Sequence, residues 1–339
     1  MRGSIVVLVT LVVAAILVAG PAHSAPGRAV VIVSGGDAVS PFTTPGEACR
    51  SGLAAGNTDT ALRENLLAAG HTVYTSPAMA GRGPVTDQTG FGAFGDCPIT
   101  LPEIMTVDST ASIDLAGEHL ARFLSYLHDT RGVDVVDVVG HSMGGLYSRA
   151  AFRVLQSLGS PIRIRSLTTL GTPWQGSFLS DYANGLTTLA DCAGDTFCEK
   201  ASQAMADEVT RLQTGSGREV NQGYLMGPQG WNEYQAGVLD RIPVVLVGGA
   251  RFTHPGPVTV WPNDGIVSNR SALATDISDR VLPHRRCASF DDTHSIYVSD
   301  AVGLPWATGL TSESRVFEVV RGAIDGADGA LQTPTRQGC

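Results

Sequence analysis

The feature that most constrains the fold of this chain is a glycine-flanked serine between two regular elements. Residues 133–139 form a valine-rich apolar run typical of a buried strand, and a helical pattern follows from Leu146. Between them stands Gly140-His141-Ser142-Met143-Gly144-Gly145. A sharp strand-to-helix turn needs small residues two before and two after its centre, because neighbouring backbones approach closely there. The pattern therefore predicts a Ser142 hydroxyl exposed at the carboxyl edge of a sheet.

Alternating elements along the rest of the chain predict an α/β fold. Short β-branched runs bounded by glycine or polar residues indicate buried central strands at residues 29–33, 133–139, 164–170 and 243–247. Segments with helical character occupy residues 60–69, 113–127, 146–158 and 312–326. Asp108 or Ser109 is the expected cap of the second helix. This order is typical of βα units, so we expect a mostly parallel central sheet flanked by helices.

Residues 175–235 interrupt this alternation with a polar stretch rich in glycine and alanine. The stretch contains Cys192, Cys198 and several short apolar clusters. Two interpretations fit it equally: an inserted cap or lid, or an ordinary set of surface helices and loops. We carry the cap forward as a prediction within a single domain of residues 25–339.

The N-terminus has the pattern of an export signal. Residues 5–19 are an apolar run behind Arg2, and Gly20-Pro21 and small residues close it. We expect residues 1–24 to be a signal peptide and the mature protein to be secreted. The alternative is an uncleaved membrane anchor, which is disfavoured because the run is shorter than the ~20 residues that a spanning helix needs.

Six cysteines in an exported chain predict disulfide bonds. Their connectivity is not determined by the sequence, because six cysteines allow many pairings. Pairing Cys192 with Cys198 closes a short local loop, and the simplest completion then joins Cys49 to Cys97 and Cys287 to Cys339. Metal ligation is not expected, because no Cys-x-x-Cys or paired Cys/His spacing occurs.

Composition excludes several classes of protein. A hydrophobic content of 43% with 16% charged residues supports a large core and argues against disorder. The net charge of −9 makes nucleic acid a poor partner, because phosphate binding needs clustered positive charge. The charges are scattered and form no basic block for anionic lipid headgroups. The sequence implies no protein partner, and we expect a monomer.

Ser142 needs a base and an orienting acid to react, because a serine hydroxyl is a poor nucleophile at its own pKa. Asp264, in the turn Asn263-Asp264-Gly265, is the candidate acid, although any Asp-Gly is also compatible with a plain β-turn. Two histidines follow Asp264, namely His284 and His294. His294 is the preferred base because it stands in a polar loop before a possible helix. His284 adjoins two arginines and is expected to be a solvated surface residue.

Two backbone donors are candidates for stabilising an oxyanion at this site. The residue after the nucleophile of such a turn supplies one N–H group, which here belongs to Met143. The glycine-rich turn after the first core strand, Ser34-Gly35-Gly36-Asp37, offers the second. We choose Gly36, with Asp37 as the alternative. A tight turn without a catalytic role remains the competing interpretation.

Four motifs in order give the chain a family resemblance: Gly140 to Gly145, Leu170-Gly171-Thr172-Pro173, Asn263-Asp264-Gly265 and His294-Ser295. The chain resembles bacterial secreted triacylglycerol lipases of the α/β-hydrolase superfamily over most of its mature length. The resemblance implies the α/β-hydrolase fold, a triad of Ser142, Asp264 and His294, and an inserted cap after the Gly-Thr-Pro turn. One departure is that the family usually opens its first oxyanion loop with His-Gly, where this chain has Ser34-Gly35.

The resemblance implies a secreted lipase or carboxylesterase that cleaves carboxylic esters through an acyl-enzyme. An acyltransferase with the same triad is one alternative, and a silent binding module with the same fold is another, although the latter predicts a damaged triad. No cofactor is expected. Some relatives hold a structural calcium ion near the histidine loop, but the spacing of Asp276, Asp279, Asp291 and Asp292 specifies no such site.

Overall fold

The computed structural model describes residues 27–46, 57–85, 99–213, 215–330 and 336–339. The expected signal peptide, residues 1–24, lies outside the described residues, and so do Cys49 and Cys97. Within those ranges, no helix combines the length and the apolar character needed to cross a bilayer.

A seven-stranded parallel sheet forms the centre of the structure, with strand order β2-β1-β5-β6-β7-β8-β9. Its strands are β1 (Arg28–Val33), β2 (Val73–Thr75), β5 (Val135–His141), β6 (Arg163–Leu170), β7 (Val244–Gly249), β8 (Arg285–Phe290) and β9 (Arg336–Gln337). The short strands β3 (Ala78–Met79) and β4 (Val107–Asp108) pair separately. The predicted mostly parallel sheet is confirmed, with β1, β5, β6 and β7 at the four predicted positions.

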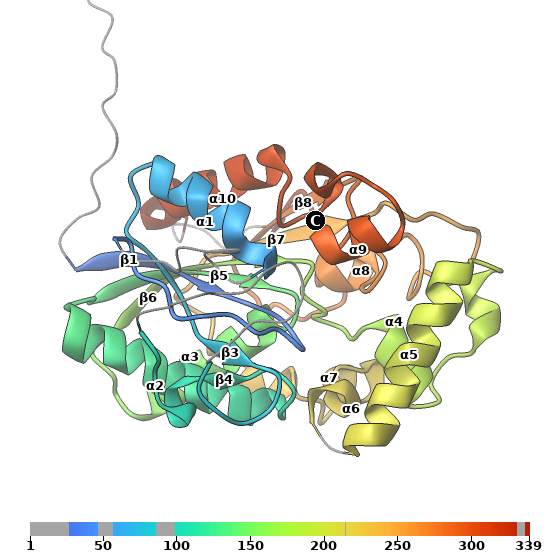
Figure 1. The fold of residues 1–339 in the computed structure, drawn as a ribbon, viewed down its shortest axis with the longest axis horizontal. Coiled ribbons are helices and arrows are strands. Elements are labelled where there is room, and N and C mark those ends of the chain that lie inside the picture. The colour runs from blue at the N-terminus through green and yellow to red at the C-terminus, as the bar shows by residue number, and fades with distance from the viewer. Residues whose placement is uncertain (1–26, 47–56, 86–98, 214, 331–335) are drawn as a thin grey trace, which may run out of the picture.

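Alternate residues of the central strands pack against helices on opposite faces of the sheet. Val31 and Val33 of β1 belong to the same apolar cluster as the inner sides of α2 (Ile113–Arg131) and α3 (Gly144–Ser157). Val30 and Ile32 instead pack with α1 (Thr60–Ala68) and α10 (Ser314–Gly326). Figure 1 shows the two helix pairs on either side of the sheet. The period-two alternation of a strand thus supplies both halves of the core.

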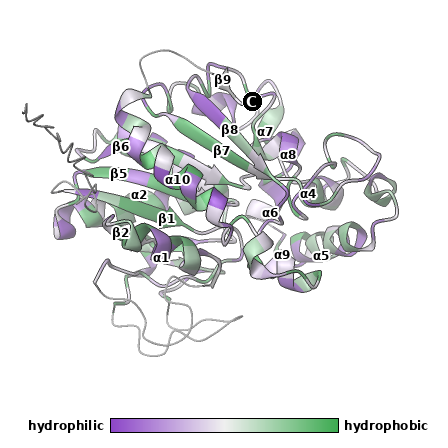
Figure 2. Ribbon diagram, turned by 90° about the horizontal axis from the view of Figure 1, so that it is seen from above, coloured by the Kyte–Doolittle hydropathy of each residue, from purple (hydrophilic) through white to green (hydrophobic). Residues whose placement is uncertain are grey.

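Hydropathy differs between the middle and the edge of this sheet. Strands β1 and β7 are largely hydrophobic, whereas β8 carries several hydrophilic residues (Figure 2). The sequence of β8, Arg-Arg-Cys-Ala-Ser-Phe, mixes charged and small residues, and only Arg285 in it is buried. This strand therefore lacks the apolar run from which the four predicted strands were recognised.

The cap predicted for the second helix was wrong. Ser112 precedes α2, and its side-chain oxygen accepts a hydrogen bond from the Leu115 amide at 3.2 Å. Asp108 belongs to β4. The hydroxyl of Ser109 donates to the carbonyls of Ala38 and Met79, so it serves the loop after β1 rather than the helix.

Residues 175–235 connect β6 to β7 and contain four short to medium helices, which lie beyond the main helix layers (right in Figure 1). These helices are α4 (Phe178–Ala183), α5 (Thr196–Leu212), α6 (Ser216–Glu219) and α7 (Gln222–Met226). The α4 and α5 helices pack against each other. A disulfide joins Cys192, in the segment between these helices, to Cys198 in the first turn of α5. A second disulfide joins Cys287 of β8 to Cys339. Both predicted pairings within the described residues are confirmed.

Candidate active site

Ser142 lies in the turn between β5 and α3 with a left-handed φ of 54°. This conformation is rare for a residue with a side chain and costs on the order of 1–3 kcal/mol. A Cβ atom at Gly144 would overlap the carbonyl oxygen of Val33, so this position of the turn accepts only glycine. The Ser142 amide donates to the Leu170 carbonyl at 2.8 Å. The strained turn is therefore held against the ends of both neighbouring strands.

Thr172 supplies a further contact to this turn. Its Oγ1 hydroxyl donates to the carbonyl oxygen of Ser142 at 2.7 Å. A Cβ atom on Gly145 would lie within overlap distance of the same hydroxyl. No role was predicted for Thr172, although the Gly171-Thr172-Pro173 turn that carries it was the available signal.

His294 and Asp264 form a buried pair at the ends of two other strands. The Nδ1 nitrogen of His294 donates to Oδ2 of Asp264 at 2.7 Å, and the two residues are 5% and 0% exposed. The other carboxylate oxygen, Oδ1, accepts from the amides of Ile266 and Val267 at 3.0 and 2.8 Å. Because the carboxylate accepts the Nδ1 proton, the lone pair of the neutral imidazole is on Nε2.

His141 fixes the backbone of the histidine loop. Its Nε2 nitrogen donates to the carbonyl oxygen of His294 at 3.0 Å, and the two rings lie 4.8 Å apart. Burial and, to a smaller extent, the neighbouring His294 together lower the pKa of His141 to about 3, so His141 stays neutral at ordinary pH. No role was predicted for this residue, because its partner lies 153 positions further along the chain.

The competing histidine, His284, lies at the other end of the sheet. It immediately precedes β8, and its carbonyl accepts from the amide of Val244, the first residue of β7. Ser142 follows β5 and His294 follows β8, so both of these lie at the carboxyl edge. The parallel sheet therefore separates His284 from Ser142. The expectation that His284 is a solvated residue was wrong, since it is half-buried and its Nδ1 atom is shielded from water.

Ser142 and His294 line one cavity of about 440 Å³ at the carboxyl edge. Most of its wall is apolar, and residues 175–235 contribute part of it. The apolar lining side chains include Leu179, Met205, Val220, Ile266 and Val298. A volume in this range and a largely apolar wall are typical of sites that bind small molecules.

The predicted oxyanion donors lie beside this cavity. Met143 and Gly36 both line it, and a Cβ atom on Gly36 would lie 2.8 Å from the sulfur of Met143. The alternative donor, the amide of Asp37, points instead to the Ser109 carbonyl at 3.4 Å. The geometry therefore favours Gly36 over Asp37 as the second donor.

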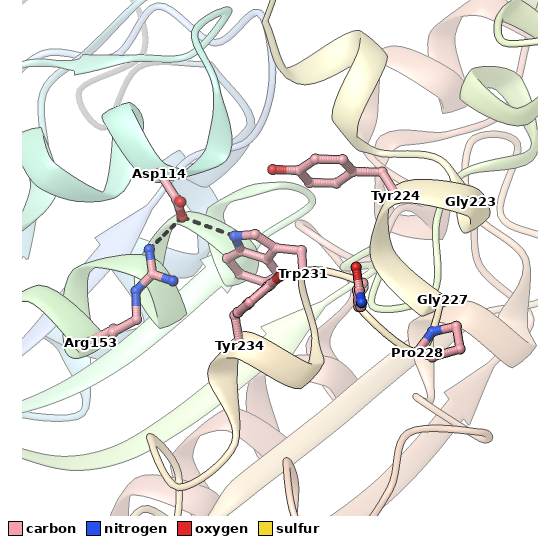
Figure 3. Close-up of a pocket in the computed structure, with 10 residues that line it drawn as sticks. Asp114, Arg153, Gly223, Tyr224, Gly227, Pro228, Trp231 and Tyr234 are labelled. Carbon is pink, nitrogen blue, oxygen red and sulfur yellow. Dashed lines mark hydrogen bonds and ion pairs between the residues drawn. The ribbon is translucent and has the colours of Figure 1, made fainter.

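A second hollow, of about 760 Å³, is lined by residues of and after α7 together with Asp114 and Arg153 (Figure 3). Asp114 accepts hydrogen bonds there from Trp231 at 2.9 Å and from Arg153 at 2.8 Å, beside Tyr224 and Tyr234. Among the described residues that line this hollow, none is a serine, cysteine or histidine. This hollow therefore has no serine beside a histidine, whereas the cavity at Ser142 is lined by both Ser142 and His294.

Three of the four acidic residues named near the histidine loop are engaged with arginines. Asp276, Asp279 and Asp291 form ion pairs with Arg270, Arg285 and Arg251. In the part of the chain that the structure describes, no three histidine, cysteine or carboxylate side chains cluster as metal ligands.

Comparison with known proteins finds lipases. No profile of a protein family matches the chain. Triacylglycerol lipases of Pseudarthrobacter phenanthrenivorans and Burkholderia plantarii are each 36% identical to it over 66 residues, which make up 20% of this chain and 19% and 17% of theirs. The crystal structure of a Bacillus licheniformis lipase in its propeptide form superposes with a TM-score of 0.52 at 14% identity, covering 94% of this chain and 53% of that one. The chain thus spans less than a fifth of the matched lipase sequences and about half of the matched structure.

Proposed function

We propose that this chain, which has the α/β-hydrolase fold, is a secreted serine hydrolase that cleaves carboxylic esters with a triad of Ser142, His294 and Asp264. The observation that carries the proposal is that Ser142 and His294 line the same apolar cavity, while His294 binds the buried Asp264. These residues follow three different strands, β5, β8 and β7. The matched proteins are triacylglycerol lipases and a lipase, which agrees with this chemistry.

The reaction begins when Nε2 of His294 takes the proton of Ser142 and Oγ attacks the ester carbonyl. Asp264 keeps the imidazole in the tautomer that leaves Nε2 free, through the 2.7 Å bond to Nδ1. Negative charge develops on the former carbonyl oxygen, and the amides of Met143 and Gly36 stabilise it. His294 returns the proton to the departing alcohol, and the acyl group stays on Ser142. Water then repeats the sequence and releases the acid.

The substrate that fits this cavity is an uncharged ester with an apolar acyl group. Thioether and aliphatic side chains cover much of the wall, and burying apolar acyl surface against them is worth about 25 cal/mol per Å². Residues 175–235, which provide Leu179, Met205 and Val220, act as the cap over this acyl site.

Covalent labelling tests the nucleophile and the base together. An organophosphonate should label the protein stoichiometrically at Ser142, with the label lost in Ser142→Ala and in His294→Ala at neutral pH. His284→Ala is the matched control, because it removes a histidine at the other edge of the sheet. Full labelling of His294→Ala with loss in His284→Ala would disprove the assignment of the base.

The rate on p-nitrophenyl esters of increasing chain length, in solution and as an emulsion, tests the substrate class. Preference for long chains at an interface indicates a lipase, and preference for short chains in solution indicates a carboxylesterase. Product analysis with added alcohol distinguishes hydrolysis from acyl transfer, because a transferase would yield a new ester instead of the free acid.

A further inference from the structure

Asp59 is a fully buried carboxylate beside the loop that follows β1. It is 0% exposed and precedes α1. Its Oδ2 atom accepts a hydrogen bond from the hydroxyl of Ser34, and its Oδ1 atom accepts from the hydroxyl of Thr58 at 3.4 Å. Oγ of Ser34 also lies 2.8 Å from Oγ of Ser40. Because Ser34 donates to the carboxylate, Ser40 must donate to Ser34.

A carboxylate in this position is costly for the fold. Among the described residues its hydrogen bonds come from hydroxyl groups and from no cationic side chain. Burial raises its pKa, the bonds from Ser34 and Thr58 oppose this shift, and the net result is a pKa of about 6. A buried acid without a cation destabilises a protein unless its hydrogen bonds compensate. An apolar residue would avoid this cost, so we expect the role of Asp59 to lie in the loop whose Ser34 hydroxyl it binds.

The loop that Asp59 holds runs along the nucleophile. A Cβ atom on Gly35, the residue after Ser34, would lie 2.5 Å from Cβ and 3.1 Å from Oγ of Ser142. Gly36 packs in the same way on Met143. A shift of Ser34 therefore displaces both the surface against which Ser142 packs and the Gly36 amide.

The far end of the loop is fixed independently. Ser40 and Ala78 exchange two backbone hydrogen bonds of 2.9 Å, which anchor the end of the loop to β3. The Ser34–Ser40 contact closes the loop across its base. The start of the loop is therefore anchored by the side chain of Ser34, and Asp59 holds that side chain in place.

We propose that Asp59 is a positioning residue that holds the oxyanion loop, residues 34–37, in its reactive geometry by binding the hydroxyl of Ser34. This inference rests on the proposed function. The chain has Ser34-Gly35 at the position where the lipases that it resembles usually have His-Gly, and Ser34 is the residue that Asp59 binds.

Substitutions of the two partners test the proposal kinetically. Asp59→Ala and Ser34→Ala should each lower kcat on a p-nitrophenyl ester about 10- to 100-fold, since small displacements of reacting groups have effects of this size. KM should change by less than about threefold, because ester binding depends mainly on the apolar wall. The double variant should be no slower than the slower single variant, because both changes break one link.

A conservative variant separates positioning from charge. In Asp59→Asn the amide can donate to Ser34, which can then donate to Ser40, so kcat should stay within about fivefold of the unsubstituted protein. Asp137→Asn is the matched control. Asp137 is equally buried, but it binds Arg165 and Arg28 and lies on β5 five residues before Ser142, about 16 Å away at strand spacing. That variant should be less stable and keep its kcat.

Amide hydrogen exchange gives a readout that does not depend on catalysis. Exchange of the Asp37 amide should accelerate about tenfold or more in Asp59→Ala and in Ser34→Ala, and should stay unchanged in Asp137→Asn. The Ser40 amide, which Ala78 anchors, should exchange at an unchanged rate in all three variants and serves as the internal reference. Unchanged kcat and unchanged exchange in a folded Asp59→Ala, or losses that multiply in the double variant, would overturn the proposal. If Asp59→Ala does not fold, the comparison rests on Ser34→Ala with and without Asp59→Asn. A protein that cleaves no ester while its loop loosens as expected would refute the proposed function alone.

Discussion

Replacing Asp264 by asparagine should invert the hydrogen-bonding role of the group that faces His294. The side chains have the same shape, so the fold is expected to survive. In the unsubstituted protein, Oδ1 of Asp264 accepts from two backbone amides, those of Ile266 and Val267, and Oδ2 accepts from His294. In Asp264→Asn the single amide oxygen can serve only one of these sides.

The backbone decides which way the new amide points. Turning its NH₂ group toward Ile266 and Val267 would leave two buried donors unpaired, at about 1–3 kcal/mol each. The oxygen therefore stays at the Oδ1 position, and the NH₂ group faces Nδ1 of His294. Nδ1 must then accept, which moves the ring proton to Nε2 and removes the base. The expected loss in kcat is about 10⁴-fold, equivalent to about 5.5 kcal/mol, as for the same exchange in other triads.

Steady-state kinetics on a p-nitrophenyl ester at neutral pH, with both proteins at the same folded concentration, measures this loss. Urea unfolding should show that the variant remains folded. The control is Asp276→Asn, which removes a carboxylate that pairs with Arg270 and should leave kcat unchanged. A kcat of Asp264→Asn within tenfold of the unsubstituted protein would refute the role given to Asp264.

Three further variants have defined outcomes. Gly171→Ala should lower both stability, by about 1–2 kcal/mol in urea unfolding, and kcat, because φ is 58° and the new Cβ would lie 2.9 Å from Nδ1 of His294. Burial, reinforced by nearby acids, raises the pKa of Asp292 to about 7, so the folded state keeps a proton that the unfolded chain loses near pH 4. The free energy of unfolding of the protein should therefore fall as the pH rises between these two values. In urea titrations, Asp292→Asn should be more stable than the unsubstituted protein at pH 8 but not at pH 4. Replacing Cys287 and Cys339 by serine opens a loop of 52 residues and should lower the free energy of unfolding by up to about 4 kcal/mol, with kcat/KM retained.

Local patterns in the sequence were sufficient for much of the fold. The strands β1, β5, β6 and β7 are buried on both faces over most of their length. β1 and β7 therefore appear as apolar runs, whereas β5 and β6 keep β-branched residues around the polar Asp137 and Arg165. In the helices that cover these strands, apolar residues recur every three to four positions and form one apolar side. The α2 and α3 helices begin within two residues of their predicted starts. Both signals depend only on residues close together in the chain, which is why the sequence alone carries them.

The contacts that orient the site join residues far apart in the chain. His141 binds the backbone of His294 across 153 positions, Thr172 binds Ser142 across 30, and Ser34 binds Asp59 across 25. Each of these residues has an ordinary local interpretation as part of a strand or a turn. Their roles depend on the order of the strands in the sheet. That order is set by pairing between distant segments, which no local sequence pattern reveals.

The order of the strands also explains why these contacts converge at one place. β1, β5, β6, β7 and β8 are consecutive neighbours, and all five run in the same direction. Their carboxyl ends therefore deliver Gly36, Ser142, Thr172, Asp264 and His294 to one edge. Backbone pairing fixes where each strand ends, but the loops beyond the ends lack ladder hydrogen bonds. Side chains such as Thr172, His141 and Asp59 replace the missing ladder there, each binding a neighbouring loop. It follows that substitutions at these positions should lower kcat more than they lower the stability of the sheet.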